Sequence, residues 1–203
     1  MAKAGIVNQV EGIEEIYSYV DSVDYNLDSL SVELLDPFKP IDELFNEAMS
    51  YAEIGIERIA IKIPIIDFGS LALAHMLHKE GVSINMTCAM SAYQGIMAHT
   101  CRPEFISFFY NRMIDYGDTS LGNTGHQYAE EQIKTLDKYL GKRITTNIIC
   151  GSIRKPRDVQ ECFAAGADIV TVPYDIVLGM FKHVKTDEAI KEFTEKWKAP
   201  RAK

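Results

Sequence analysis

The chain has 203 residues, a formal net charge of −8 and a hydrophobic content of 47%. This length is typical of one domain and this apolar content can build a full-sized core, so we expect a single domain over residues 1–203. The acidic balance argues against nucleic acid or an anionic membrane as a partner, because either would need a basic face. Any anionic substrate must therefore be held by a local cluster of positive charge.

Cysteine usage and the first residues indicate the compartment. The four cysteines form no CxxC pair, and three lie in or beside apolar segments, which is typical of reduced, mostly buried thiols. Residues 1–12 lack the apolar run of a signal peptide, and no stretch approaches the roughly 18 apolar residues of a membrane span. We expect a cytoplasmic protein without a membrane partner.

Strand-like and helix-like segments alternate along the chain. Residues 13–20 are helix-like and residues 4–7 are a weak apolar start. Strands are predicted at 31–35, 58–66, 82–88, 104–109, 144–151 and 168–173. Helices are predicted at 41–54, 70–79, after the cap Ser91, and at 126–140, 156–165, 174–182 and from the cap Thr186 to Trp197, with a polar loop at 115–125. Such repeated units predict an α/β fold with a parallel sheet, either a barrel or a doubly wound sheet, with six strands rather than the eight of a closed barrel.

One lysine, Lys62, lies inside an apolar strand at 58–66. A charged lysine in such a strand is costly, so burial should lower its pKa. A neutral buried amine is what Schiff-base chemistry on a sugar ketone requires. Taken alone, a lysine that extends from the strand end to water is the more frequent explanation.

The neighbouring strands change that balance. Side chains alternate between the two faces of a strand, and the isoleucines of 58–66 share the face opposite Lys62. On four strands, the same alternation directs polar residues to one interior: Glu33, Lys62, Asn85, Thr87 and Ser107. One buried polar residue is usually a satisfied core group, whereas a set of five around a lysine indicates a site.

A second cluster, GSIRKPR at residues 151–157, ends the fifth strand and opens a helix. Backbone N–H groups at a helix start, with a hydroxyl and arginines, suit a phosphate group, although a solvated basic turn would have the same composition. Arg112, three residues beyond the fourth strand, is placed to supply a second guanidinium. His75 and His78 are better explained by a surface helix than by a metal site. The chain has no GxGxxG or Walker sequence, and Schiff-base chemistry needs no metal or organic cofactor because the imine is the electrophile, so we expect neither.

Taken in order, these motifs resemble the small transaldolase family, which includes the fructose-6-phosphate aldolases. The similarity covers residues 31–197. It rests on SVE at 31–33, KIP at 62–64, NMT at 85–87, SFFYNR at 107–112, GSIRKP at 151–156, GAD at 166–168 and TVP at 171–173. The resemblance implies a class I aldolase-type TIM (β/α)8 barrel, here apparently without its first two strands.

The resemblance also implies roles for individual residues. Lys62 matches the Schiff-base lysine, Glu33 the carboxylate that works with the catalytic water, and Thr87 the hydroxyl that positions this water. Asn85, Ser107 and Phe109 match residues of the dihydroxyacetone site, and Arg112, Ser152 and Arg154 match the phosphate-binding groups.

Two positions separate the branches of the family. Phe109 and Glu33 resemble transaldolase, since the aldolase branch has tyrosine and glutamine there. The implied reaction transfers a dihydroxyacetone unit from sedoheptulose 7-phosphate to glyceraldehyde 3-phosphate, in the pentose phosphate pathway. The alternatives are a fructose-6-phosphate aldolase and a catalytically weak sugar-phosphate-binding paralogue. Phosphorylated sugars are the implied partners, and a homo-oligomer (pentamer or decamer, through the terminal helix) is the implied assembly.

The chain departs from the family pattern near its start. A strand carrying an aspartate and a second strand ending in a Thr-Asn-Pro-type motif are not recognisable. Phe108 replaces the usual proline, and Arg102-Pro103 replaces a small-residue turn. Two strands and one helix are thus expected to be absent, so either the chain is a truncated form or another segment or subunit covers the gap. For a true truncation we expect low or no activity.

Overall fold

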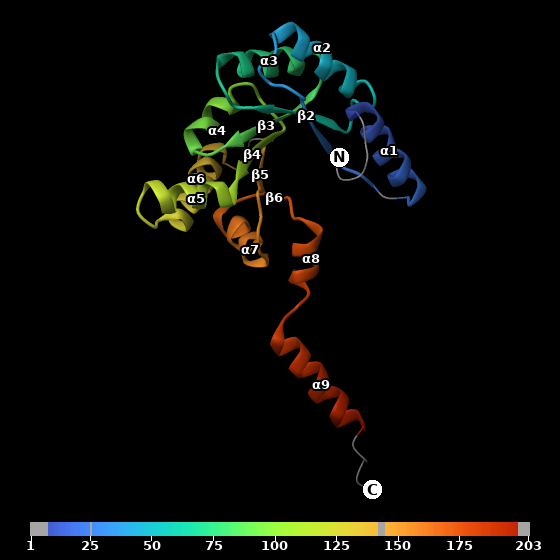
Figure 1. Ribbon diagram of the computed structural model, residues 1–203, viewed down its shortest axis with the longest axis vertical. Coiled ribbons are helices and arrows are strands. Elements are labelled where there is room, and N and C mark those ends of the chain that lie inside the picture. The colour runs from blue at the N-terminus through green and yellow to red at the C-terminus, as the bar shows by residue number, and fades with distance from the viewer. Residues whose placement is uncertain (1–7, 25, 142–144, 199–203) are drawn as a thin grey trace.

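We describe a computed structural model of the chain, for residues 8–24, 26–141 and 145–198. Over these ranges, six parallel strands form one sheet in the order β1 to β6, so each strand pairs with its neighbour in the sequence (Figure 1). The strands are β1 (Leu30–Glu33), β2 (Ile59–Pro64), β3 (Ser83–Ala89), β4 (Phe105–Phe109), β5 (Asn147–Gly151) and β6 (Ile169–Val170).

Nine helices accompany the sheet in the described part of the chain, and most of them lie on its outer side (Figure 1). They are α1 (Gln9–Ser22), α2 (Ile41–Ala52), α3 (Phe68–Lys79), α4 (Ala92–His99), α5 (Tyr110–Ser120), α6 (Gly125–Leu140), α7 (Pro156–Ala165), α8 (Tyr174–Met180) and α9 (Val184–Lys198). The sheet curls into a half-barrel. The α/β class and the incomplete TIM-type barrel expected from the sequence are confirmed.

The alternation of apolar and polar residues determines which face of the sheet meets the helices. Ile59, Ile61 and Ile63 of β2 are at most 2% exposed and belong to the main core, as do Ile84 and Ile106 on the next two strands. Burying this continuous apolar layer between sheet and helices is the main favourable term for the fold. The residues between these isoleucines therefore face the inner side of the half-barrel.

Local capping sets where several helices begin and end. Asp67 precedes α3 and accepts a hydrogen bond from the Ser70 amide at 3.1 Å, while Ser91 caps α4 as expected. Gly166 follows α7 in the left-handed region, with φ of 109°, where a side chain would be strained. These signals explain why the helix boundaries lie close to those predicted.

Three predicted boundaries are wrong. The expected polar loop at 115–125 is helical as far as Ser120, because α5 begins directly after β4. The terminal helix α9 begins at Val184, so Thr186 lies in its first turn instead of capping it. The sixth strand is only two residues long. The weak apolar start at 4–7 and the beginning of the predicted strand at 144 lie outside the described residues.

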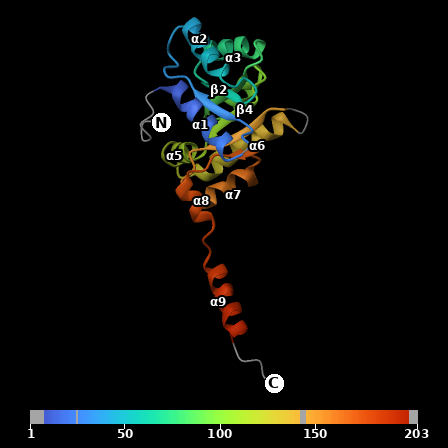
Figure 2. The ribbon, with the colours of Figure 1, turned by 90° about the vertical axis from the view of Figure 1, so that its right-hand side faces the viewer.

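The terminal helix α9 extends away from the half-barrel (Figures 1 and 2). It has no buried residues, and Ile190 and Phe193 on its apolar stripe are 57% and 61% exposed. No helix in the described ranges combines the length and apolarity needed to cross a membrane.

The contact between α5 and α6 supplies a stability prediction. A Cβ at Gly117 would lie 2.5 Å from Gly125 Cα, so Gly117→Ala should force the two helices apart. We expect the free energy of unfolding to fall by about 1–3 kcal/mol, as for other overpacked sites. Without this obstruction, Gly→Ala inside a helix would stabilise by about 1 kcal/mol. Urea unfolding measures the difference, with the exposed Ser120→Ala as control. Unchanged or increased stability of Gly117→Ala would contradict the packing described.

Candidate active site

The side chains of Lys62 and Glu33 meet on the inner face of the half-barrel. Their Cα atoms are directly opposite in the parallel register of β1 and β2. Lys62 Nζ lies 2.5 Å from Glu33 Oε1, within an ion pair. The lysine side chain is 21% exposed and the glutamate side chain 62%, so the pair is more open to solvent than the sequence predicted. A primary amine, an adjacent carboxylate and solvent access together suit reaction with a carbonyl compound.

A hydrogen-bonded chain of polar residues crosses the same face beside Lys62. Asn85 lies opposite Lys62 in the register of β2 and β3. Its Oδ1 accepts a hydrogen bond from Ser107 Oγ at 2.7 Å, and its Nδ2 donates to Ser31 Oγ at 3.0 Å. Asn85 is 2% exposed and Ser107 is 5% exposed. These two hydrogen bonds orient the Asn85 amide beside Lys62.

Thr87 lies on the inner side of β3, where the strand is irregular. Its Cα is opposite that of Pro64, and the register with β4 shifts between Met86 and Ala89. The Thr87 hydroxyl is buried and makes no hydrogen bond of ordinary geometry within the described residues, although its closeness to the Cys88 thiol lowers the pKa of that thiol. Buried hydroxyls are nearly always paired, so this oxygen is available to a water molecule or a substrate group.

Cys88 follows in this irregular stretch, with a left-handed φ of 60°. Burial raises the pKa of its thiol, against a smaller lowering by the positive charge of Lys62, and the charges of Glu33 and Arg112 also act on it. Cys88 therefore lies within electrostatic range of both Lys62 and Arg112.

The strand β4 and the start of α5 position Phe109 and Arg112. The Arg112 guanidinium carbon lies 5.1 Å from the centre of the Phe109 ring, a cation–π arrangement. Arg112 also lines a pocket of about 320 Å³ together with Tyr93, Tyr116 and Tyr128. In the described part of the chain, no carboxylate lies within ion-pair distance of Arg112. Its charge is thus available to an anionic ligand.

The turn after β5 is organised by a buried carboxylate that the sequence reasoning missed. Asp158 is fully buried, and its Oδ2 accepts hydrogen bonds from the Arg154 amide at 2.9 Å and the Lys155 amide at 3.2 Å. Asn111 Nδ2 donates to the same oxygen at 2.6 Å and to the Ser152 carbonyl at 2.9 Å. Two backbone N–H groups that we expected to face a phosphate are therefore used by Asp158.

The position of Asp158 was visible in the sequence. It is the third residue of α7, where an acidic side chain commonly returns to cap the backbone before the helix. Nothing in the sequence pointed to its partner Asn111, which lies 47 positions earlier in the chain. Ser152 is held with a φ of 62°, which fixes the path of the turn.

The Arg154 side chain does not point freely into solvent. Its Nη1 and Nη2 donate to the two carboxylate oxygens of Asp115 at 2.8 and 2.5 Å. These hydrogen bonds lower the pKa of Asp115, and they raise the pKa of Arg154. Both side chains are 54% exposed. The guanidinium predicted to bind phosphate is thus occupied by a carboxylate of α5.

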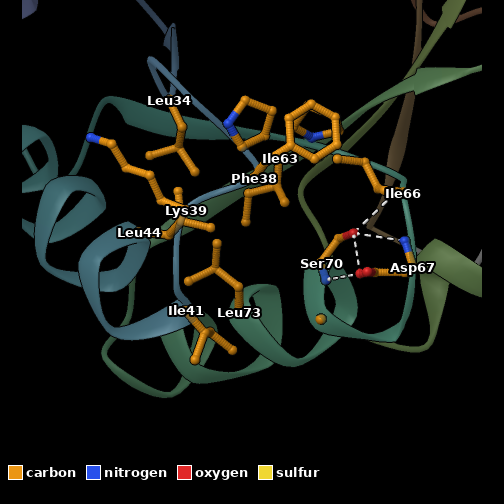
Figure 3. Close-up of a pocket in the computed structure, with 13 residues that line it drawn as sticks. Leu34, Phe38, Lys39, Ile41, Leu44, Ile63, Ile66, Asp67, Ser70 and Leu73 are labelled. Atoms are coloured by element: carbon orange, nitrogen blue, oxygen red, sulfur yellow. Dashed lines mark hydrogen bonds between the residues drawn. The ribbon is translucent and has the colours of Figure 1, made fainter.

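Another cavity, of about 220 Å³, lies on the outer side of the sheet between the segment after β1 and the start of α3 (Figure 3). Leu34, Phe38 and Ile63 supply apolar walls, while the capping pair Asp67 and Ser70 forms one side (Figure 3). It contains none of the residues predicted for catalysis or phosphate binding. We therefore place the candidate active site on the inner face, around Lys62.

Comparisons with known proteins identify the family of this chain. The Transaldolase/Fructose-6-phosphate aldolase family matches residues 10–202. A "Probable transaldolase" of Clostridium botulinum (strain Eklund 17B / Type B) is 36% identical over 183 residues, which is 90% of this chain and 77% of that protein. A "Probable transaldolase" of Clostridium tetani is 35% identical, and a "Probable transaldolase 1" of Listeria monocytogenes is 34% identical. Each of these two alignments covers 93% of this chain and 80% of the relative. The chain therefore belongs to the transaldolase/fructose-6-phosphate aldolase family.

Proposed function

We propose that the protein is a transaldolase that transfers a dihydroxyacetone unit from sedoheptulose 7-phosphate to glyceraldehyde 3-phosphate, in the pentose phosphate pathway. The observation that carries this proposal is the 2.5 Å contact between Lys62 Nζ and Glu33 Oε1 on the inner face. An amine that must lose a proton before it attacks a ketone has a carboxylate in direct contact to accept that proton. The names of the relatives support the same activity.

The reaction follows from these groups. The neutral Lys62 amine attacks the donor ketone, and loss of water gives an imine between the lysine nitrogen and the former carbonyl carbon. As the adjacent C–C bond breaks, the imine, which is protonated at nitrogen, takes up the bonding electrons and becomes a neutral enamine. A base removes the proton of the donor hydroxyl that becomes the leaving aldehyde. Glu33, acting directly or through a water bound at Thr87, is the base we assign to this step. The enamine then adds to the acceptor aldehyde, and hydrolysis frees Lys62.

The buried polar chain would hold the three-carbon unit. Asn85 offers its amide beside Lys62, and Ser107 holds that amide in place through the 2.7 Å hydrogen bond. The phosphate of the donor and the acceptor would bind near Arg112, Ser152 and Arg154. Such rigid placement lowers the entropic cost of bringing the ketone to the amine.

Phe109 favours transaldolase over fructose-6-phosphate aldolase. Its ring stacks with Arg112 and carries no hydroxyl, so this position offers no proton to the enamine. An enamine that is not protonated stays bound to the lysine until it adds to an acceptor aldehyde, and this addition is the second half of a transferase reaction. We further infer that the protein acts as a homo-oligomer, since the exposed apolar stripe on α9 gives a surface for association.

The lysine assignment predicts a covalent adduct. Incubation with fructose 6-phosphate and borohydride should fix a three-carbon unit on Lys62, which peptide mass spectrometry detects. Lys62→Arg should form no adduct and lose activity on the order of 10⁴-fold or more, because a guanidinium stays protonated. Lys134→Arg, on the exposed face of α6, is the matched control. No adduct at saturating donor would remove the proposal.

The branch assignment predicts dependence on an acceptor. With fructose 6-phosphate as donor, turnover should be fast only when erythrose 4-phosphate is added, because the enamine is discharged onto an aldehyde. The measurement compares initial rates with and without this acceptor. Release of free dihydroxyacetone at the same rate in both reactions would identify an aldolase. An adduct with no turnover under either condition would identify a catalytically weak paralogue.

The phosphate assignment predicts an effect on substrate binding. Arg154→Ala should raise KM for phosphorylated donors about tenfold or more while kcat changes little, because uniform binding is lost. Steady-state kinetics measures both constants, and Arg157→Ala is the control, since Arg157 pairs with Glu161 on α7. An unchanged KM in Arg154→Ala would show that the phosphate binds elsewhere.

A further inference from the structure

Two arginines assigned to the phosphate differ in what they contact. Arg112 stacks on Phe109 and forms no ion pair with a carboxylate among the described residues. Arg154 instead gives both arms of its guanidinium to Asp115, at 2.8 and 2.5 Å. This paired geometry is the one in which guanidinium binds a phosphate group through two parallel hydrogen bonds. The carboxylate of Asp115 therefore occupies the place of a phosphate on Arg154.

Asp115 lies close to the position proposed for the substrate phosphate. Asp115 follows Arg112 by three residues on α5, so the two side chains are neighbours on one helix face. A phosphate bridging Arg112 and Arg154 would have to lie beside the Asp115 carboxylate. Like charges at such a distance repel, so the carboxylate and the phosphate cannot both be bound favourably.

The ion pair between Arg154 and Asp115 is weak enough for a phosphate to replace the carboxylate. Both side chains of the pair are 54% exposed, and exposed ion pairs contribute little net stability because water and salt screen them. The backbone of Arg154, in contrast, is fixed by its amide hydrogen bond to the buried Asp158. An exchange of partners is thereby confined to the guanidinium, and the turn after β5 need not move.

We propose that Asp115 is a specificity-determining residue that holds the Arg154 guanidinium in the unliganded protein and is exchanged for the phosphate of the substrate. Arg112 gives the phosphate its first contact, and Arg154 then leaves Asp115 to complete the binding. Asp115 thereby weakens the affinity for any small anion, so that only a substrate also anchored at Lys62 retains the phosphate. This inference rests on the proposed function, in which Arg154 binds that phosphate.

The test measures the affinity for inorganic phosphate by calorimetric titration at low ionic strength. Asp115→Asn should bind phosphate about two- to tenfold more tightly than the unchanged protein, since the competing charge is removed while the side-chain size is kept. Asp42→Asn, in the first turn of α2, removes the same charge elsewhere and should leave the affinity unchanged. The gain of Asp115→Asn should shrink at high salt. Unchanged or weaker binding in Asp115→Asn would overturn the proposal.

A double-mutant cycle separates exchange at Arg154 from a general effect of charge. In the Arg154→Gln background, Asp115→Asn should give no gain, and absence of measurable binding with or without Asp115 agrees with this. An equal gain in both backgrounds would overturn the exchange at Arg154. If the unchanged protein and Asp115→Asn both bind no phosphate, the phosphate site itself is wrong.

Kinetics distinguishes this inference from the proposed function. Asp115→Asn should lower KM for fructose 6-phosphate but leave the borohydride adduct with unphosphorylated dihydroxyacetone unchanged, because that ligand has no phosphate. A substitution that only damaged the structure would change both KM for fructose 6-phosphate and the yield of the dihydroxyacetone adduct. Failure of the dihydroxyacetone adduct in the unchanged protein would refute the Schiff-base function, whereas the phosphate titrations would still decide the role of Asp115.

Discussion

The contact between Lys62 and Glu33 depends on the register of two adjacent parallel strands. Because their Cα atoms are opposite each other, both side chains leave the sheet on the same side and at the same height. A shift of one residue would turn one of them into the apolar layer beneath the helices. The isoleucines of β2 fix this register, because only one register buries all of them in the apolar layer. The hydrophobic core on the outer face thus determines which polar side chains meet on the inner face.

The turn that carries Arg154 depends on a second, polar constraint. Asp158 is a fully buried carboxylate that joins the turn after β5 to Asn111 on α5. Removing one partner of such a buried network would leave the others without hydrogen bonds, which is costly. The network keeps the two elements that carry Arg112 and Arg154 together. It also holds the backbone of the GSIRKP segment in place, although its arginine side chain is exposed.

Much of this arrangement was accessible from the sequence, for reasons that differ between residues. The inward direction of Asn85, Ser107 and Lys62 follows from strand alternation alone, since side chains in a strand alternate strictly. The order of the strands follows from the repeated βα units. Contacts that depend on helix placement were not accessible. The pairing of Arg154 with Asp115 joins the turn after β5 to α5. Because the segment of α5 that contains Asp115 was predicted to be a loop, the local sequence gave no indication of this pair.

Helix α5 shows why that prediction failed. Its segment contains glycine, aspartate and threonine, which are poor helix formers and typical of loops. Gly117 is nevertheless required inside the helix, because its missing Cβ lets α6 approach to within contact of its backbone. Tertiary packing thus overrides local propensity at the element that carries both Arg112 and Asp115.

The most direct measurement of the central claim is the single-turnover rate of Glu33→Gln with fructose 6-phosphate and an acceptor aldehyde. Because Glu33 is the proposed group for proton transfer, the variant should cleave and transfer the three-carbon unit about 10²- to 10⁴-fold more slowly. It should still give a borohydride-trapped adduct on Lys62 after long incubation, because the amine itself remains. A Glu33→Gln variant that turns over at the unchanged rate would contradict the pairing of Lys62 with Glu33 as the basis of the chemistry.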